Sequence, residues 1–180
     1  MSTQFPGVHS VQVYESDGEL ARSVSALVAP SLLLGDSVLV VATAEHRDQI
    51  RHELEHIGID FAPYVCEGRY TALDAAEVLQ SIMVGDSPDR GLFREHFGAA
   101  IAAARKRANN RNSGLTIYGE CVALLWEQGR QQAALAIEQF WDELFQEGES
   151  LHLHCAYRRS VVADQGEFDS LCSAHSRVLQ

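Results

Sequence analysis

The run from Ser37 to Ala42, Ser-Val-Leu-Val-Val-Ala, constrains the fold most, because it is apolar without alternation. Strands of this kind are buried on both faces, as in a parallel sheet covered by helices. Three further stretches are rich in β-branched and aromatic residues and are also predicted strands: Val8 to Tyr14, Leu115 to Tyr118 and Leu151 to Tyr157. We expect the side chains at the centre of this sheet to be buried: Val38 to Val41, Ile117 and Leu153.

Segments with helical spacing of apolar residues separate these strands. A helix is predicted to begin at Ser16 or Asp17, and a second one to run from Thr43 to Gly58. A long helix is predicted over Ala133 to Phe145. Strands that alternate with helices in this way predict an α/β fold, with a mainly parallel sheet flanked by helices.

The remaining segments are predicted to be connections and short elements. We predict a short strand over Phe61 to Cys66, and a helix that starts at Asp74. Met83 to Pro88 is rich in turn residues, and Asn109 to Gly114 is predicted to be an exposed, mobile loop. A last helical segment is predicted to begin at Phe168.

The size of the chain predicts one domain over residues 1–180, in which residues 1–7 form an N-terminal tail. The tail has neither the basic start nor the apolar segment of a signal peptide, so we expect a cytoplasmic protein. No apolar run is long enough to cross a membrane. The net charge of −11 argues against direct binding to nucleic acid. The four cysteines lack CxxC spacing and are predicted to be reduced thiols.

Glu120 is the residue around which we expect a site to form. It follows the strand that ends at Tyr118-Gly119 and precedes a helix that ends near Gly129. Ligands bind at this edge of open α/β sheets, where the carboxyl ends of strands meet helix starts. An acid at a helix start also stabilises the helix dipole. Both interpretations, a ligand contact and a structural cap, are open at this point.

Two histidine patterns in the sequence are candidates for metal binding. His52-Glu53-Leu54-Glu55-His56 matches the HExxH pattern of zinc proteases. The apolar face of this helix, with Ile50, Leu54 and Ile57, lies opposite the two histidines, so we expect both of them to face solvent. His152 and His154 share one face of a strand and, together with a thiol, are the remaining metal candidates. Two ligands without a neighbouring carboxylate favour a packing role for them.

Motifs for nucleotide binding and acyl transfer are missing from the sequence. No Gly-x-x-x-x-Gly-Lys-Ser/Thr run follows a strand, and the turn from Glu15 to Gly18 carries acids instead. These acids would repel a triphosphate. There is also no Gly-x-Ser-x-Gly elbow and no Gly-x-Gly-x-x-Gly fingerprint.

The sequence resembles the MEDS family, the sensory domain of methanogen and methylotroph signalling proteins and of a dichloromethane-responsive regulator. The resemblance covers His9 to Leu179. It is carried by these segments: His9 to Glu15, Gly35 to Thr43 with Glu45-His46, Leu73-Asp74-Ala75, Phe93, Tyr118 to Trp126, Glu138 with Trp141, Cys155-Ala156-Tyr157, and His175-Ser176 with Val178. Cys121 departs from the pattern, because a methionine is expected there.

The resemblance implies a RecA or KaiC-like α/β domain without a phosphate loop, which senses small organic molecules. Such domains are often attached to histidine kinases or DNA-binding modules. We therefore expect a small organic ligand and a signalling partner such as a histidine kinase or regulator, with a homodimer also compatible. We expect no enzyme activity and no cofactor. The alternative is a RecA-like nucleotide-binding protein or ATPase with a degenerate phosphate site.

The candidate ligand-binding residues lie mainly at or after the carboxyl ends of strands, where a crevice is expected. They are Tyr14, Glu15, Asp74, Glu120, Trp126 and Tyr157. Trp126 lies well inside its helix, so a place in the core is also open. His9 lies at the opposite end of its strand, and we expect it to make a structural hydrogen bond.

Overall fold

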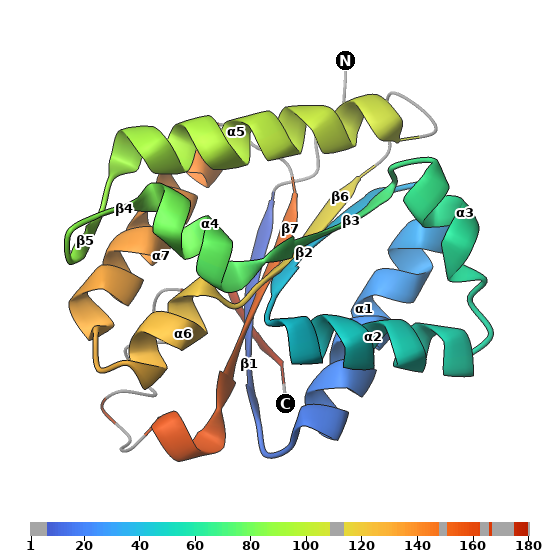
Figure 1. The fold of residues 1–180 in the computed structure, drawn as a ribbon, viewed down its shortest axis with the longest axis horizontal. Coiled ribbons are helices and arrows are strands. Elements are labelled where there is room, and N and C mark those ends of the chain that lie inside the picture. Colours follow the sequence, from blue (N-terminus) through green and yellow to red (C-terminus); the bar gives the residue numbers. More distant parts are fainter. Residues whose placement is uncertain (1–6, 109–113, 148–150, 163–165, 167–174, 180) are drawn as a thin grey trace.

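The computed structural model describes residues 7–108, 114–147, 151–162, 166 and 175–179. Its centre is a sheet of six strands: β1 (Val8–Tyr14), β2 (Ser37–Ala42), β3 (Tyr70–Asp74), β6 (Leu115–Gly119), β7 (His152–Arg158) and β8 (Arg177–Leu179). The strand order is β3-β2-β6-β7-β1-β8, and the paired strands are parallel. The predicted α/β fold with a parallel sheet flanked by helices is confirmed (Figure 1).

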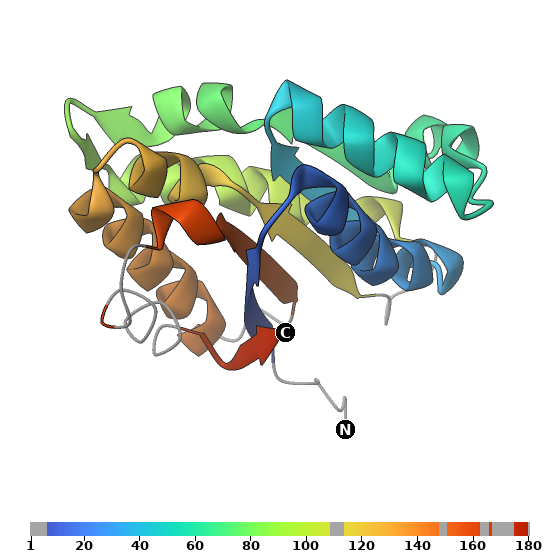
Figure 2. The same cartoon turned by 90° about the horizontal axis from the view of Figure 1, so that it is seen from below.

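Helices cover both faces of this sheet. One face packs against α1 (Asp17–Leu33) and α2 (Ala44–His56), with α3 (Phe61–Cys66) at the edge beside β3. The other face packs against α4 (Ala75–Ile82), α5 (Arg90–Arg107), α6 (Cys121–Glu127) and α7 (Gln131–Gln146). Figure 2 shows the sheet between these two layers.

The central strands are buried as their apolar sequences predict. Val38 to Val41, Ile117 and Leu153 are each at most 1% exposed. Alternate side chains of β2 enter opposite cores: Val38 and Val40 face α1 and α2, whereas Leu39 and Val41 face α4 and α5. A strand that is buried on both faces therefore requires the apolar run without alternation.

Most helix boundaries follow the predicted caps. The Ser16 hydroxyl accepts the N–H of Glu19 at the start of α1, and the Thr43 hydroxyl accepts the N–H of His46 at the start of α2. Asp74 caps α4 by accepting the N–H groups of Ala76 and Glu77. Such side chains satisfy helix donors that have no partner within the helix.

Two predictions in the region between α2 and α4 were wrong or incomplete. Phe61–Cys66 is the short helix α3 and not a strand. Pro63 lies in its first turn, where a missing N–H costs no helical hydrogen bond. Tyr70–Asp74 is the edge strand β3, although only a helix start was predicted there. This strand is partly exposed, and its sequence lacks the apolar run of a central strand.

The connection from Met83 to Pro88 contains two short strands, β4 (Met83–Val84) and β5 (Ser87–Pro88), which pair antiparallel. Gly85 between them has a φ of 61°, a conformation that favours glycine. The 3-10 helix η1 (Arg159–Val161) follows β7. The tail 1–7, except Gly7, lies outside the described residues, as do residues 109–113 of the predicted loop and the predicted helix at Phe168.

Candidate functional site

The fold creates a crevice at the carboxyl ends of its central strands. The helices after β1 and β2 pack on one face, whereas the helices after β3 and β6 pack on the other. The segments that follow β2 and β6 therefore run to opposite faces of the sheet. Open α/β sheets bind ligands at such a point. A cleft of about 260 Å³ opens there, which we call the carboxyl-end cleft. It is lined by Tyr14, Asp17, Thr43, Glu45, His46, Glu120, Ala123, Leu124, Glu127 and Arg158.

The Glu120 side chain forms the floor of this cleft. It is only 3% exposed, and its carboxylate accepts three hydrogen bonds. Oε2 accepts the backbone N–H of Thr43 at 2.8 Å, and Oε1 accepts from Tyr118 Oη at 2.7 Å and lies 2.6 Å from His46 Nδ1. These bonds tie the end of β6 to the start of α2. Buried carboxylates require such partners, so the arrangement favours a structural role.

His46 connects Glu120 to the acid on the opposite wall of the cleft. Its Nε2 lies 3.4 Å from Oδ1 of Asp17, so both ring nitrogens face carboxylates. The hydrogen bond with Glu120 raises the pKa of His46, and Asp17 adds to this, although burial acts in the opposite direction. A protonated imidazole donates through both nitrogens. His46 therefore carries a proton more readily than a free histidine.

Arg158 and Tyr14 line the cleft next to Asp17. The Arg158 guanidinium pairs with the Asp17 carboxylate and lies 5.3 Å from the centre of the Tyr14 ring. Burial alone would raise the pKa of Asp17, but hydrogen bonds from His46 and Arg158 outweigh it and lower that pKa. Burial also raises the pKa of Tyr14 to about 12, so its hydroxyl stays protonated. The cleft thus offers a neutral hydroxyl among paired charges.

Acids outnumber cations on the walls of this cleft. Asp17, Glu45, Glu120 and Glu127 line it together with Arg158 and His46. The single arginine is already paired with Asp17, so it offers little uncompensated charge to an anion. This balance favours an uncharged or cationic ligand over a phosphate.

The structure brings two of the predicted ligand-binding residues together and separates the others. Tyr14 and Glu120 both line the carboxyl-end cleft. Trp126 and Tyr157 are buried in the core on the opposite face of the sheet, 5.8 Å apart between ring centres. They do not line this cleft, because the alternation of β7 turns Tyr157 toward α7.

Glu15 and Asp74 lie at the carboxyl ends of β1 and β3 but do not line the cleft. Glu15 is exposed, and its carboxylate lies 3.5 Å from Nε of Arg159. Asp74 uses Oδ1 to cap α4 and pairs with Arg47 through Oδ2 at 3.0 Å. Both carboxylates therefore have structural partners.

A second depression lies at the edge of the sheet and is larger, about 410 Å³. We call it the edge hollow. It is formed by α2, α3 and β3 and lined by Ala44, Arg47, Asp48, Arg51, Phe61, Val65, Tyr70 and Ala72. It does not lie where strands diverge, and the polar network around Glu120 does not extend into it. We therefore treat it as the competing location in tests of ligand binding.

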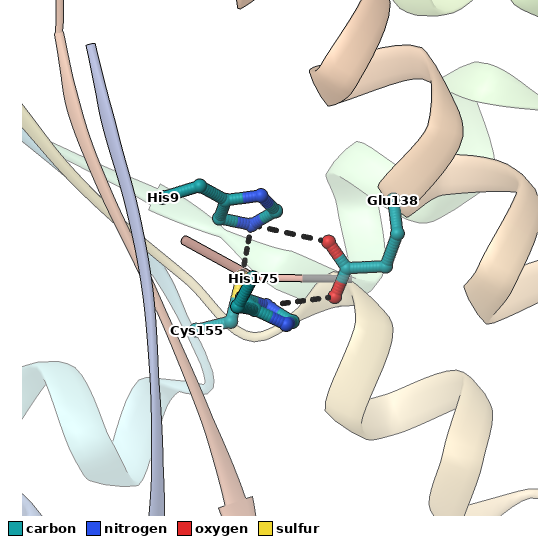
Figure 3. A group of neighbouring side chains, drawn as sticks. All are labelled: His9, Glu138, Cys155 and His175. Atoms are coloured by element: carbon teal, nitrogen blue, oxygen red, sulfur yellow. Dashed lines mark hydrogen bonds and ion pairs between the residues drawn. The ribbon is translucent and has the colours of Figure 1, made fainter. Parts of the chain in front are cut away.

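The structure also gathers four metal-ligating side chains on the other face of the sheet. Among the described residues, His9, Glu138, Cys155 and His175 form the one group of three or more His, Cys, Asp or Glu side chains that could hold a metal ion, and their ligand atoms all lie within 4.8 Å of one another. Figure 3 shows them pointing toward a common centre. Each is at most 9% exposed. We call this group the four-residue cluster.

Sequence reasoning missed the four-residue cluster. Its members come from the start of β1, the middle of α7, the middle of β7 and the residue before Ser176, so no spacing motif joins them. His9 was predicted to make only a structural hydrogen bond. The one signal was that all four residues fall within the segments that carry the family resemblance.

The predicted histidine pairs have other environments. His152 and His154 both face Ser10, whose Oγ lies 2.9 Å from Nε2 of His152 and 3.0 Å from Nδ1 of His154. This supports the packing role expected of them. His52 and His56 are exposed on α2, as predicted. Ile57 is also exposed and not on the buried face, because it is the C-cap where the helix ends.

The proton on His46 is expected to make stability depend on pH. The pKa of His46 in the folded protein lies above the ordinary histidine value of 6.5, so the folded state binds the proton more tightly than the unfolded state. The stabilisation of the folded state by this proton is fully present below pH 6.5, and it is lost as the pH rises through the pKa of His46 in the folded protein. Urea unfolding across this window should show the loss in the wild type but not in His46→Gln. His56→Gln, at the exposed end of the same helix, should behave like the wild type, and a His46→Gln curve parallel to wild type would contradict the assignment.

Taken together, the fold and the cleft define a single α/β domain with a crevice of about 260 Å³ at the carboxyl ends of a parallel sheet. The family model described as MEthanogen/methylotroph, DcmR Sensory domain matches residues 8–176. The chain therefore belongs to the MEDS family of sensory domains, which confirms the resemblance seen in the sequence. No curated protein matches the chain. Within the described residues, no helix is both long and apolar enough to span a membrane.

Proposed function

We propose that this sensory domain binds a small organic molecule, uncharged or cationic, in the carboxyl-end cleft. The observation that carries the proposal is the cleft itself, which opens where the chains after β2 and β6 diverge. Its walls combine the apolar side chains of Ala123 and Leu124 with the polar groups of Tyr14, Thr43 and His46. Ligand sites have this mixture of apolar walls and a few placed polar groups.

The cleft residues have different parts in this proposal. Tyr14, His46 and Arg158 would contact the ligand, because these polar side chains belong to residues that line the cleft. Glu120 would act mainly by holding His46 and the Thr43 backbone in place. Direct ligand contacts by Glu15, Asp74, Trp126 and Tyr157 stay predictions. In the structure, the two acids pair with arginines, and the two aromatic side chains lie in the core.

The signal would pass through the helices that begin at the cleft. Asp17 is the first residue of α1, and His46 lies in the first turn of α2, so both helix starts meet the ligand site. A ligand that binds one arrangement of these helices better shifts the population toward it. We propose that a signalling protein, such as a histidine kinase or a regulator, reads this shift in the cytoplasm. A homodimer is compatible with this role.

The alternative is nucleotide binding by a RecA or KaiC-like domain with a degenerate phosphate site. Glu15 follows β1, and the first turn of α1 carries Asp17 and Glu19. These acids oppose a phosphate at the position where a phosphate loop would lie. We therefore favour a RecA-like domain that has lost its phosphate loop and that binds its ligand without catalysis.

A thermal-shift screen of the whole chain tests this function. The compounds are small alcohols, halocarbons, amines and aromatics, with ATP and magnesium as the comparison. We expect at least one uncharged or cationic compound to raise the melting temperature, because a ligand at 100 times its dissociation constant adds about 2.7 kcal/mol of stability. ATP with magnesium should leave it unchanged. Tight binding or hydrolysis of ATP would overturn the proposal in favour of the nucleotide alternative.

A further inference from the structure

The four-residue cluster presents a set of ligand atoms that suits a metal ion. It offers two imidazole nitrogens, one carboxylate and one thiol, all buried. Borderline metals such as Zn²⁺ take this combination of nitrogen, oxygen and sulfur ligands. The cluster lies on the face of the sheet opposite the His46 side of the carboxyl-end cleft, so it is a separate site.

Three distances within the cluster are close to the edge lengths of a tetrahedron around zinc. His9 Nε2 lies 3.2 Å from Glu138 Oε2, whereas His175 Nε2 lies 3.4 Å from the other oxygen of this carboxylate, Oε1. With one ligand atom from each residue, all four ligand atoms lie within 4.8 Å of one another. His9 Nε2 lies 3.7 Å from Cys155 Sγ. Usual zinc bond lengths place tetrahedral ligands about 3.3 Å apart for nitrogen and oxygen, and about 3.6 Å apart for nitrogen and sulfur. Charge-assisted hydrogen bonds are shorter, about 2.7 to 2.9 Å.

Charge gives a second reason for a metal ion in this place. Glu138 is 2% exposed, and a buried carboxylate is costly unless a positive charge compensates it. A divalent ion bound by one carboxylate, one thiolate and two neutral imidazoles makes a neutral unit. On binding, the Cys155 thiol releases its proton to solvent, and sulfur donates its electron pair to the metal. The site needs no other co-reactant.

Two further side chains, Tyr157 and Asp142, lie next to the cluster. Tyr157 Oη donates a hydrogen bond of 2.9 Å to Oε1 of Glu138. Asp142 Oδ1 lies 3.6 Å from Nδ1 of His9, the ring nitrogen that faces away from the cluster. Of these two side chains, only Tyr157 is hydrogen-bonded to the cluster, because 3.6 Å is longer than a hydrogen bond.

We propose that His9, Glu138, Cys155 and His175 bind one divalent transition-metal ion of the zinc class in a closed tetrahedral site. The site joins β1, α7, β7 and the segment before β8. Backbone and side-chain hydrogen bonds between His9 and Ser176 already hold that segment beside β1. The metal would fasten the C-terminal strand to the sheet, as structural zinc sites do.

Titration with Co²⁺, a spectroscopic substitute for zinc, tests the proposal on the full chain purified without a histidine tag. We expect one equivalent to bind and to give the visible absorption of tetrahedral Co²⁺ with a thiolate charge-transfer band. Zinc should displace the cobalt and abolish both signals. No binding, or binding without the thiolate band, would overturn the proposal.

Paired variants locate the ion. Cys155→Ser should lose the thiolate band, and Glu138→Gln should weaken binding at least tenfold. Cys121→Ser, a buried cysteine on the same face, and His152→Gln, on the opposite face, should keep both the band and the affinity. Retention of the band in Cys155→Ser would place the sulfur ligand elsewhere and refute the assignment.

Circular dichroism identifies any variant that fails to fold. In that case, anomalous scattering from a crystal of the cobalt-loaded wild-type protein decides the question. An ion bonded to Cys155 Sγ and His9 Nε2 supports the proposal. An ion bound only at the exposed histidines of α2, His52 and His56, would overturn it.

Discussion

Replacing Glu120 with alanine is expected to lower the free energy of unfolding by roughly 3 kcal/mol or more. The substitution leaves three partners without their acceptor: the Thr43 N–H, the His46 ring and the Tyr118 hydroxyl. Each buried donor without a partner costs about 1 to 3 kcal/mol, and more where a charge is involved. For a domain of this size the melting temperature should fall by roughly 6 to 12 °C.

Two further variants show whether burial or charge causes this loss. Glu120→Gln keeps a carbonyl acceptor but removes the charge that faces His46, so we expect an intermediate loss. Glu127→Ala, an exposed acid at the end of α6, should melt within about 1 °C to 2 °C of the wild type. A Glu120→Ala protein that melts with the wild type would show that the carboxylate is dispensable for folding. In that case, the role of Glu120 would be direct contact with the ligand.

Replacing Phe93 with alanine should cost roughly 3 to 5 kcal/mol, the usual loss for a buried phenylalanine. Phe93 is fully buried and lies at the centre of the aromatic contacts between α5 and α7. Its ring centre lies 4.8 Å from that of Phe97, 5.4 Å from that of Phe140 and 5.1 Å from that of Trp141. The substitution leaves a cavity beside all three rings, and urea unfolding measures the cost.

Leu92 is the matched control for this substitution, because it precedes Phe93 on α5 but is 37% exposed. Leu92→Ala should change the free energy of unfolding by less than about 1 kcal/mol. Equal losses for the two variants would contradict the assignment of the α5 face that packs against α7.

The sequence predicts the fold well where local pattern and tertiary environment agree. The apolar run of β2 and the Ser16 and Thr43 caps require little knowledge of the rest of the chain. Prediction fails at the edge of the sheet, where burial is partial. Phe61–Cys66 has residues typical of strands, yet it forms a helix that packs beside β3. Tertiary contacts decide such short segments, and propensity does not.

The sites are harder to predict, because they depend on which face each side chain occupies. Tyr157 and Arg158 are neighbours at the end of β7, yet Arg158 lines the cleft while Tyr157 enters the opposite core. The partners of Glu120 illustrate the same difficulty. His46 is 74 residues away in sequence and meets Glu120 only because β2 and β6 are adjacent. Strand order of this kind has no local sequence signal.

The most direct test of the central claim is the affinity of two bulky variants for the strongest binder of the screen, measured by calorimetric titration. Leu124→Trp fills the carboxyl-end cleft, and Val65→Trp fills the edge hollow. If the ligand binds where β2 and β6 diverge, Leu124→Trp loses binding at least tenfold, while Val65→Trp binds like the wild type. The reverse result, with binding lost in Val65→Trp and kept in Leu124→Trp, would place the ligand in the edge hollow and contradict the account.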